Sequence, residues 1–457
     1  MKFDKSILRE ADIRGVYKKQ ITTKFAERLG KVFGSYLRSI GVKTLVVGHD
    51  NRHGSVELSK SLLESITSTG VDVIFIGLVT TPMLNFASRK LEVEYGIMVT
   101  ASHNPSCDNG FKLFGKNYQH CDYDELKIIY DALSNEDYKI YEGSGKIINL
   151  EINDLYSKSV RESIKLGKRK TKVVIDPGNG TSSIIVKKIY DRFPFEVIYI
   201  NDESNPDFPN HHPDPNVKAN MTELCKAVIE NNADLGLAYD GDADRCGFVD
   251  NEGNVIDADI LMAIMCKSII KESANKTVLI DVKCSNTLRD EILACKGNIY
   301  LDTPSSAKQE RDMLYNDIAF GGGYSNHIFF RDRHPGYDDG IYVGLRLQEL
   351  LSHTNLNLTD LLKNLNTYYH TDEIKVKTTD KLKFEIVESI KKYAIENNYE
   401  IDTTDGVKVI KGSSSWGLLR ASNTGPNLTL RFEATTKQEL KNIQKEFTDV
   451  LSKIMNK

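Results

Sequence analysis

Apolar residues recur along the chain at two spacings. Between Thr23 and Ile40 they follow steps of three and four and stop before Gly41, which predicts an amphipathic helix. The same spacing predicts a second helix over 56–69. Continuous apolar runs, which predict buried strands, lie at 44–47, 73–76 and 95–99. Strands that alternate with helices predict βαβ units and a mainly parallel sheet.

This alternation recurs later in the chain. Apolar runs at 172–175 and 277–280 are each followed by a polar loop and a helical pattern, which suggests three related α/β units. The C-terminal part differs, because it combines short strands with helices over 381–396 and 436–455 and is expected to be α+β. Thr436 and Glu439 form a capping-box pattern at the start of the last helix. The domains are therefore expected at 1–150, 151–254, 255–367 and 368–457.

Composition narrows the functional classes. The chain has 457 residues, and its 60 basic and 64 acidic side chains nearly cancel, so no global charge favours nucleic acid or an anionic membrane as partner. The N-terminus lacks a signal-peptide core and no apolar run is long enough to span a bilayer. The seven cysteines are odd in number and show no Cys-x-x-Cys spacing, which favours reduced thiols and a cytoplasmic location.

A candidate nucleophile follows the apolar run at 95–99. In the stretch from Thr100 to Lys112, Ser102 stands at the expected end of a strand with His103 beside it. A serine hydroxyl is a weak nucleophile and needs a nearby base or positive charge. The stretch therefore suits a serine that takes and gives a phosphoryl group, and the alternative is an ordinary polar turn.

Three carboxylates, Asp240, Asp242 and Asp244, follow another apolar run. Along an extended backbone alternate side chains face one way, so the three are expected to converge on one hard cation, for which Mg²⁺ with a phosphate ligand fits best. An EF-hand does not match, because Arg245 stands where glycine belongs. The alternatives are a solvated acidic turn and a phosphatase of the haloacid-dehalogenase type, which also begins with strand-Asp-x-Asp.

The loop from Arg420 to Pro426 joins two expected strands of the last domain. It offers a guanidinium, hydroxyls, an amide and backbone N–H groups, which together suit a phosphate. Arg431 either supports this loop or is an exposed strand arginine. Taken alone, Arg14 is more often a surface ion-pair residue and His327 a structural one.

Taken together, these motifs resemble the α-D-phosphohexomutase family, in its bacterial phosphomannomutase/phosphoglucomutase branch. The resemblance covers the whole chain, in the family's order. Its motifs are Asp12-Ile13-Arg14-Gly15, Thr100-Ala101-Ser102-His103-Asn104-Pro105, Asp240-Gly241-Asp242-Ala243-Asp244-Arg245, Gly336-Tyr337-Asp338-Asp339 and Arg420-Ala421-Ser422-Asn423-Thr424.

The resemblance implies a four-domain architecture around a central cleft, with three related mixed α/β domains and a C-terminal TATA-box-binding-protein-like domain that is expected to move. It implies phosphoserine at Ser102 and Mg²⁺ held by Ser102, Asp240, Asp242 and Asp244. The implied reaction moves a phosphoryl group between the 1- and 6-positions of a phosphorylated hexose, mannose or glucose phosphate, with the hexose 1,6-bisphosphate as intermediate and activator.

The resemblance also assigns roles to single residues. Arg14 and Arg245 would stabilise the transferring group, and His103 and Lys112 are the candidates for proton transfer. The oligomeric state is not predicted. The residues expected to bind substrate are Arg420, Ser422, Asn423, Thr424, His327, Ser325 and Lys283.

The chain departs from the family pattern around the sugar. Gly323 stands where the family has a glutamate, Ala11 where it has a tyrosine, His49 where it has an arginine, and Gly425 where it has a glutamate. We therefore expect a shifted or relaxed sugar preference. The competing hypotheses are a phosphosugar hydrolase with Asp240 as nucleophile and a non-catalytic phosphosugar-binding protein.

Overall fold

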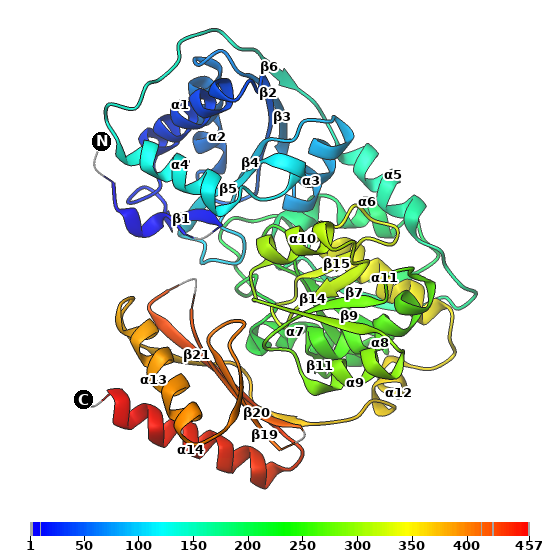
Figure 1. Cartoon of the computed structure of the whole chain (residues 1–457). Helices are drawn as coiled ribbons and strands as arrows, with labels where there is room; N and C mark the ends of the chain where they lie inside the picture. Colours follow the sequence, from blue (N-terminus) through cyan, green and yellow to red (C-terminus); the bar gives the residue numbers. More distant parts are fainter. Residues whose placement is uncertain (1–2, 10, 413, 423–424, 456–457) are drawn as a thin grey trace. The chain divides into compact units, whose positions relative to one another are not determined.

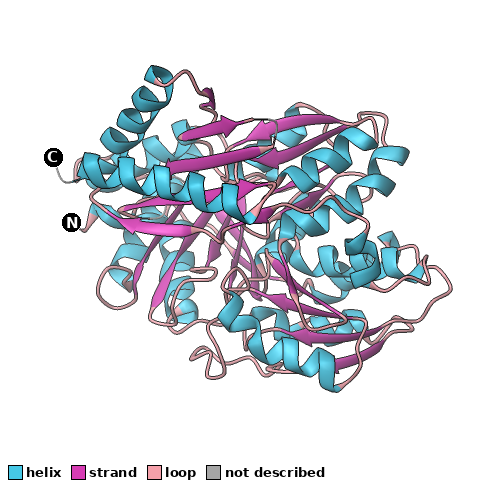
Figure 2. Ribbon diagram, turned by 90° about the horizontal axis from the view of Figure 1, so that it is seen from below, coloured by secondary structure: helices cyan, strands magenta, loops and turns pink. Residues whose placement is uncertain are grey.

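The chain forms two compact units. The computed structural model describes residues 3–9, 11–412, 414–422 and 425–455. The first unit comprises Met1–Ile256 with Asn326–Asp360, and the second comprises Asp257–Ser325 with Leu361–Lys457. Helices lie against strands throughout the chain (Figure 2). The two units are described separately below.

The first unit opens with a six-stranded sheet. Its strands are β1 (Asp12–Val16), β2 (Thr44–His49), β3 (Asp72–Leu78), β4 (Gly96–Val99), β5 (Asp108–Phe114) and β6 (Ile147–Asn149). Their order in the sheet is β1-β5-β4-β2-β3-β6. Strand β2 is parallel to β3 and β4, whereas β5 is antiparallel to both β4 and β1. Three of the five pairings are parallel, so the sheet is mainly parallel as expected. Strand β5 is the exception, because it follows β4 through a short loop with no crossover helix.

Helices α1 (Thr23–Ser39) and α2 (Ser55–Thr67) confirm the two predicted helices and pack on each other (Figure 1). The Thr22 hydroxyl accepts from Phe25 N at 3.1 Å and caps α1. The apolar face of α1, including Phe25, Leu29 and Val32, is fully buried in the core of this domain. The sheet's other helices are α3 (Thr81–Lys90) and α4 (Tyr123–Ser134).

A second, five-stranded sheet follows. Its strands are β7 (Lys172–Asp176), β8 (Glu196–Tyr199), β9 (Leu235–Tyr239), β10 (Cys246–Asp250) and β11 (Val255–Ile256), in the order β11-β10-β9-β7-β8. Strand β7 is parallel to β8 and β9, and β10 is antiparallel to β9. The first unit also contains β15 (Ile328–Phe330) and the helices α5 (Asn153–Ser163), α6 (Val186–Tyr190), α7 (Thr222–Glu230) and α11 (Gly340–Ser352).

The helix expected after β7 is interrupted. A 3₁₀ turn over Thr181–Ile184 precedes the five-residue α6, and Ile185 between them has φ −129° and ψ −27°. Ile184, Ile185 and Val186 are consecutive β-branched residues, whose stiff side chains crowd a helical backbone. Other 3₁₀ turns lie at Lys5–Ile7, Lys116–Tyr118 and Lys218–Met221.

The first strand of the second unit is β12 (Thr277–Asp281), which is parallel to β13 (Asn298–Asp302) and β14 (Phe320–Gly322). Helices α8 (Ala258–Glu272), α9 (Asn286–Ala294) and α10 (Ser306–Tyr315) accompany these strands. Helix α12 (Leu358–Lys363) stands at the change from the first unit to the second along the chain.

The C-terminal part has an antiparallel sheet, as the α+β pattern predicts. Its strands are β16 (Tyr369–His370), β17 (Ile374–Lys377), β18 (Glu400–Asp402), β19 (Val407–Lys411), β20 (Ser415–Ala421) and β21 (Asn427–Ala434). Helices α13 (Leu382–Glu396) and α14 (Lys437–Met455) lie together on one side of it (Figure 1). Thr436 accepts from Glu439 N at 3.1 Å, which confirms the predicted cap of α14.

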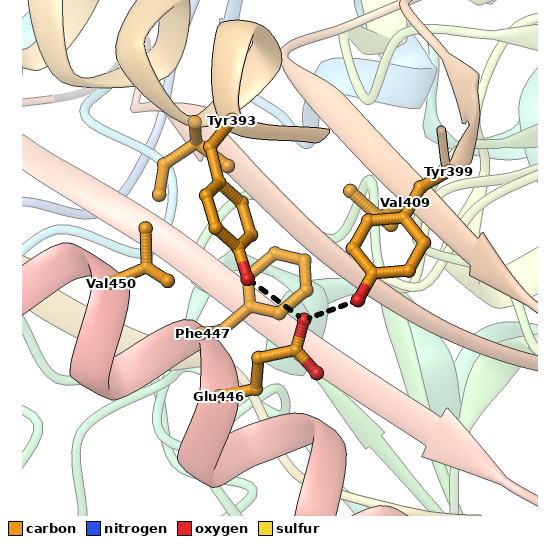
Figure 3. Close-up of a pocket in the computed structure, with 7 residues that line it drawn as sticks. Tyr393, Tyr399, Val409, Glu446, Phe447 and Val450 are labelled. Carbon is orange, nitrogen blue, oxygen red and sulfur yellow. Dashed lines mark hydrogen bonds between the residues drawn. The ribbon is translucent and has the colours of Figure 1, made fainter. Parts of the chain in front are cut away.

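A small pocket lies between α13, α14 and β19 (Figure 3). The carboxylate of Glu446 accepts from the hydroxyls of Tyr399 at 3.0 Å and Tyr393 at 3.3 Å and forms an ion pair with Lys411. The remaining lining residues, Ile390, Val409, Phe447 and Val450, are apolar. Three donors inside the protein already contact the Glu446 carboxylate. These contacts hold α14 to its neighbours, and the pocket offers little to a ligand.

Two sequence expectations concern thiols and membranes. All seven cysteines are free, and Cys121, Cys246, Cys266 and Cys284 are buried, which fits the expectation of reduced thiols. Among the helices in the described part of the chain, none combines the length and the apolar character that crossing a bilayer requires.

Lys408 on β19 is a buried cation in the C-terminal core. Its ammonium donates to Val282 O at 3.0 Å and lies 3.8 Å from the centre of the Trp416 ring. Burial, reinforced by the charge of Arg289, lowers the pKa of Lys408 from 10.5 to about 8. Below about pH 8 Lys408 is therefore charged in both states, but its charge is poorly solvated only in the folded state.

Replacing Lys408 with methionine should raise the free energy of unfolding by about 1–3 kcal/mol near pH 7. Between the folded pKa and the unfolded value of 10.5 the folded wild type releases the proton first, so its stability rises with pH and the variant's advantage shrinks. Urea titrations at about pH 7 and about pH 9.5, followed by the fluorescence of the single tryptophan, measure both effects. An equal advantage at both pH values would contradict this account.

Candidate active site

Ser102 lies in a strained loop directly after β4. Its φ is 52°, in the left-handed region that a non-glycine residue seldom adopts. Its N–H donates to Thr100 Oγ1 at 2.9 Å, and its carbonyl accepts from Arg52 Nη2 at 2.5 Å. The same guanidinium nitrogen also donates to Asn104 O at 2.6 Å. These bonds hold Ser102 in its unfavourable conformation, as strained backbone at functional sites requires.

The Ser102 hydroxyl points at the two groups that could use it. It donates to Asp240 Oδ2 at 2.9 Å and lies 3.2 Å from His103 Nδ1. Gly241 makes this approach possible, because a Cβ there would lie 2.4 Å from the Ser102 carbonyl oxygen. The serine loop and the acidic loop, far apart in the sequence, are therefore in direct contact within the first unit.

The three aspartates converge, but on a different backbone from the expected one. Asp240, Asp242 and Asp244 lie in a turn between β9 and β10, in which Ala243 has φ 61°, so the premise of an extended backbone is wrong. The turn nevertheless brings one carboxylate oxygen of each residue within 4.8 Å of the others. All three residues are buried.

The oxygens of this cluster fit a divalent cation. Oδ1 of Asp242 and Oδ1 of Asp244 are buried without a hydrogen-bond partner, whereas the oxygens of Asp240 accept from Ser102 and from Arg245 N. Buried anionic oxygens without a partner are costly, and a bound cation would supply the missing one. An all-carboxylate set is hard, which favours Mg²⁺ or Ca²⁺ over softer metals.

Lys112 on β5 partly balances this charge. Its ammonium donates to Asp242 Oδ2 at 2.6 Å and to Asp244 Oδ2 at 2.5 Å. Burial opposes the charge, but the two carboxylates outweigh it and raise the pKa of Lys112. Burial also raises the pKa of Asp240, and Asp244 and Asp242 add to this because they repel its charge. One lysine therefore does not neutralise the cluster.

Arg245 is tied to a histidine and a fourth carboxylate. Its Nε donates to His327 Nε2 at 2.9 Å, and His327 Nδ1 lies 2.7 Å from Asp338 Oδ2. Both ring nitrogens of His327 are thus engaged within the protein. One oxygen of Asp338 also lies within 4.8 Å of ligand atoms of His327 and Asp244. Sequence reasoning gave Asp338 no role, although the motif at 336–339 contains it.

Arg14 on β1 approaches the serine loop. Its Nη1 donates to Asn104 Oδ1 at 3.1 Å, and its Nη2 pairs with Asp12 at 2.6 Å. Burial, together with the charges of Arg245 and Arg14, lowers the pKa of His103 well below its usual value, so this imidazole is neutral. The structure therefore brings five predicted residues together in the first unit: Ser102, His103, Lys112, Arg14 and Arg245.

Two residues of this site were missed in the sequence. Arg52 holds the Ser102 carbonyl, and Thr81 Oγ1 donates to Asp242 Oδ2 at 2.5 Å. Arg52 lies in the loop between β2 and α2, and Thr81 is the first residue of α3. Neither has a chemical motif around it. Their roles depend on tertiary contacts that local sequence does not encode.

In the second unit, Lys283 and Ser325 lie together. The Lys283 ammonium donates to Ser325 Oγ at 2.6 Å and to Glu373 Oε1 at 2.8 Å. Glu373 was not predicted, because nothing in its local sequence distinguishes it from a surface acid. The three residues form a charged and polar cluster of the kind that binds hydroxyl groups.

The expected phosphate loop follows β20 in the second unit. Arg420 Nε donates to Asp405 Oδ2 at 2.5 Å, and Ser422 N donates to Asn427 O at 2.9 Å, which closes the base of the loop. Asn423 and Thr424 lie outside the described residues. Arg431 is not an exposed strand arginine: it is fully buried and donates to Asp259 Oδ2 at 3.2 Å.

Comparison with known proteins agrees with this picture. Residues 5–139, 154–253 and 257–369 match the models of the phosphoglucomutase/phosphomannomutase alpha/beta/alpha domains I, II and III, and residues 373–450 match the C-terminal domain of the same family. A phosphomannomutase/phosphoglucomutase of Pseudomonas syringae is 36% identical over 98% of the chain and 96% of its own length. A phosphoglucomutase of Neisseria gonorrhoeae is 32% identical over 98% of the chain and 97% of its own.

A solved structure is also similar throughout. The phosphoglucomutase/phosphomannomutase family protein of Burkholderia thailandensis superposes with a TM-score of 0.92 at 30% identity, over 99% of this chain and 98% of that one. The fold and the site define a phosphosugar mutase built from three mixed α/β domains and a C-terminal α+β domain. The chain belongs to the phosphoglucomutase/phosphomannomutase family.

The unpartnered oxygens predict a measurable effect of a divalent cation on stability. Adding Mg²⁺ to protein treated with a chelator should raise the melting temperature, because the ion binds only the folded cluster. Asp242→Asn should abolish this increase, since the amide removes a charged ligand. Glu230→Gln, at an exposed position on α7, is the matched control and should keep the full shift. The same shift in both variants would contradict binding at this cluster.

Proposed function

We propose that the chain interconverts a hexose 1-phosphate and a hexose 6-phosphate through a phosphoserine at Ser102. The observation that carries this proposal is the Ser102 hydroxyl, held by a strained backbone between His103 and the acidic loop. Membership of a mutase family decides for an enzyme over a binding protein, and for a mutase over a hydrolase. The free thiols fit a cytoplasmic location, which is part of the proposal.

In the proposed reaction, a free hydroxyl of the sugar attacks the phosphorus of phosphorylated Ser102. The new P–O bond to the sugar forms as the bond to Ser102 Oγ breaks, which leaves a hexose 1,6-bisphosphate and a serine hydroxyl. The sugar then reorients, and the other phosphoryl group returns to Ser102. His103 lies 3.2 Å from Ser102 Oγ and is the proposed carrier of the exchanged proton.

Positive charge is needed where the phosphoryl group moves. Lys112, Arg245 and Arg14 are proposed to stabilise it electrostatically, because phosphoryl transfer depends mainly on positioning and charge. Asp240, Asp242 and Asp244, with an oxygen of phosphorylated Ser102, would hold Mg²⁺, which supplies compensation for the charge on the phosphoryl oxygens.

Two residue groups of the second unit have proposed substrate roles. Arg420 and Ser422, with Asn423 and Thr424, would bind the phosphate that is not reacting. Lys283 and Ser325 would bind sugar hydroxyls. His327, also expected among the substrate residues, has both ring nitrogens engaged with Arg245 and Asp338. Support comes from the loop chemistry and from the Lys283–Ser325–Glu373 cluster. The division into domains at 1–150, 151–254, 255–367 and 368–457 also stays a prediction.

The decisive experiment is phosphorylation of Ser102. Incubation with glucose 1,6-bisphosphate should add the mass of one phosphoryl group to the wild type and none to Ser102→Ala, because the hydroxyl is the acceptor. Interconversion of glucose or mannose 1-phosphate, measured in a coupled assay, should be lost in the same variant. Ser106→Ala, in the same loop, is the control and should keep both. Phosphate release by Ser102→Ala at the wild-type rate would instead indicate a hydrolase.

Gly323 has no room for the glutamate that the family has at this position. A Cβ at this position would lie 2.0 Å from Asp281 Oδ2. Asp281 is fully buried and accepts from Lys283 N at 2.7 Å and Tyr324 N at 3.1 Å, so it cannot easily move aside. The Asp281 carboxylate leaves no room for a side chain at position 323, and we propose that the chain consequently has a broader or shifted sugar preference.

Restoring the family's glutamate should therefore fail. Gly323→Glu is expected to lower stability by about 1–3 kcal/mol through overpacking, without lowering the KM for glucose or mannose 1-phosphate. If Asp281 is the obstacle, Asp281→Ala combined with Gly323→Ala should be less unstable than the sum of the single changes, as a double-mutant cycle measures. Tighter sugar binding by Gly323→Glu, or a family-typical sugar preference of the wild type, would contradict the proposal.

A further inference from the structure

Lys383, near the start of α13, contacts both sides of the proposed phosphate loop. It is 7% exposed, and its ammonium donates to Ser422 O at 2.9 Å and to Gly425 O at 3.3 Å. A third acceptor, Asp380 Oδ1, lies at 2.9 Å. Ser422 and Gly425 stand on either side of residues 423–424 in the sequence, so one side chain joins two described parts of the loop.

The three contacts define what Lys383 can do. A lysine ammonium has three N–H donors and no acceptor, and here three acceptors surround it. A phosphate could therefore reach this ammonium only by displacing one of them. The geometry favours a lysine that fixes the loop backbone over one that binds the ligand.

Arg420, at the other end of the loop, is fixed by a residue outside it. Asp405 precedes β19 and accepts from Arg420 Nε at 2.5 Å. Gly406 beside it has φ 73°, and a Cβ there would lie 2.4 Å from Leu419 O and 2.7 Å from the Arg420 Cα. This turn is thus packed directly on the backbone that carries the arginine.

The charge of Asp405 makes this contact informative. A carboxylate in contact with Arg420 reduces the attraction of that guanidinium for a phosphate dianion. If charge alone decides phosphate binding, Asp405 weakens it. If the orientation of the Arg420 guanidinium decides it, Asp405 strengthens it. The bond from Nε to Asp405 sets the direction of the guanidinium.

We propose that Lys383 and Asp405 are positioning residues that hold Arg420, Ser422 and Gly425 of the phosphate loop in place before the ligand arrives. Lys383 fixes the carbonyls of Ser422 and Gly425, and Asp405 fixes the guanidinium of Arg420. The benefit is that binding does not have to order these three residues. This inference rests on the proposed phosphate role of the loop.

The role of Asp405 is tested by whether its removal weakens or strengthens the binding of a sugar phosphate. The probes are glucose 1-phosphate and mannose 1-phosphate, titrated calorimetrically into full-length Ser102→Ala protein, which binds without turnover. Asp405→Ala should raise the Kd about tenfold through loss of orientation. Asp405→Asn keeps an acceptor without the charge and should restore the Kd or lower it. A lower Kd for Asp405→Ala would show that the carboxylate acts only through its charge and would overturn the inference.

Lys383 is tested in the same background. Lys383→Met should also raise the Kd about tenfold, whereas Lys381→Met, at an 88% exposed position nearby, should leave it unchanged. Trp416 fluorescence in urea reports the stability of each variant. Lower stability with an unchanged Kd would make Lys383 merely structural and overturn its proposed role.

A kinetic measurement separates this inference from the proposed function. In protein with Ser102 intact, Lys383→Met and Asp405→Ala should raise KM yet still accept the phosphoryl group at Ser102. If neither sugar phosphate binds the Ser102→Ala parent, the phosphate role of the loop fails and the inference with it. If the parent binds and the variants bind equally well, only the inference fails.

Discussion

The structure of the first unit depends on how a buried cluster of negative charge is balanced. Asp240, Asp242 and Asp244 lie in one turn, and the Lys112 ammonium contacts only two of them. Carboxylates that share a site repel one another, so the fold must supply compensating charge. A phosphoryl group on Ser102 would add roughly two more negative charges. A site that holds such a group needs a cation, and the oxygens of Asp242 and Asp244 that lack a partner are where it would bind.

The same requirement explains the contacts around the cluster. Arg52 donates to the Ser102 carbonyl and pairs with Asp50, and Arg245 donates to His327 and lies near Asp244, so both guanidinium groups are held in place. Fixed charges stabilise a moving phosphoryl group better than mobile ones, since they need no reorganisation during the reaction. The left-handed φ of Ser102 is consistent with this rigidity, because the surrounding bonds maintain it.

Local patterns predicted much of this fold and only part of the site. Helices α1 and α2 and the cap of α14 followed from apolar spacing and from Thr436, because amphipathic periodicity and capping are local properties. The convergence of the aspartates was predicted for a wrong reason, since Ala243 turns the backbone. The direction of β5 and the roles of Arg52, Thr81 and Asp338 could not be predicted, because they depend on tertiary contacts between segments far apart in the chain.

The two units differ in what fixes their functional groups. Around Ser102 the residues proposed to react also hold one another, through hydrogen bonds in which at least one partner is an acidic or basic side chain. In the second unit the candidate ligand-binding groups depend on residues outside their motifs: Asp281 excludes a side chain at Gly323, and Asp405 directs Arg420. We expect substitutions at such supporting residues to alter recognition without touching the phosphoryl-transfer chemistry. On this proposal, the sugar preference of the chain depends on residues that lie outside the serine and aspartate loops.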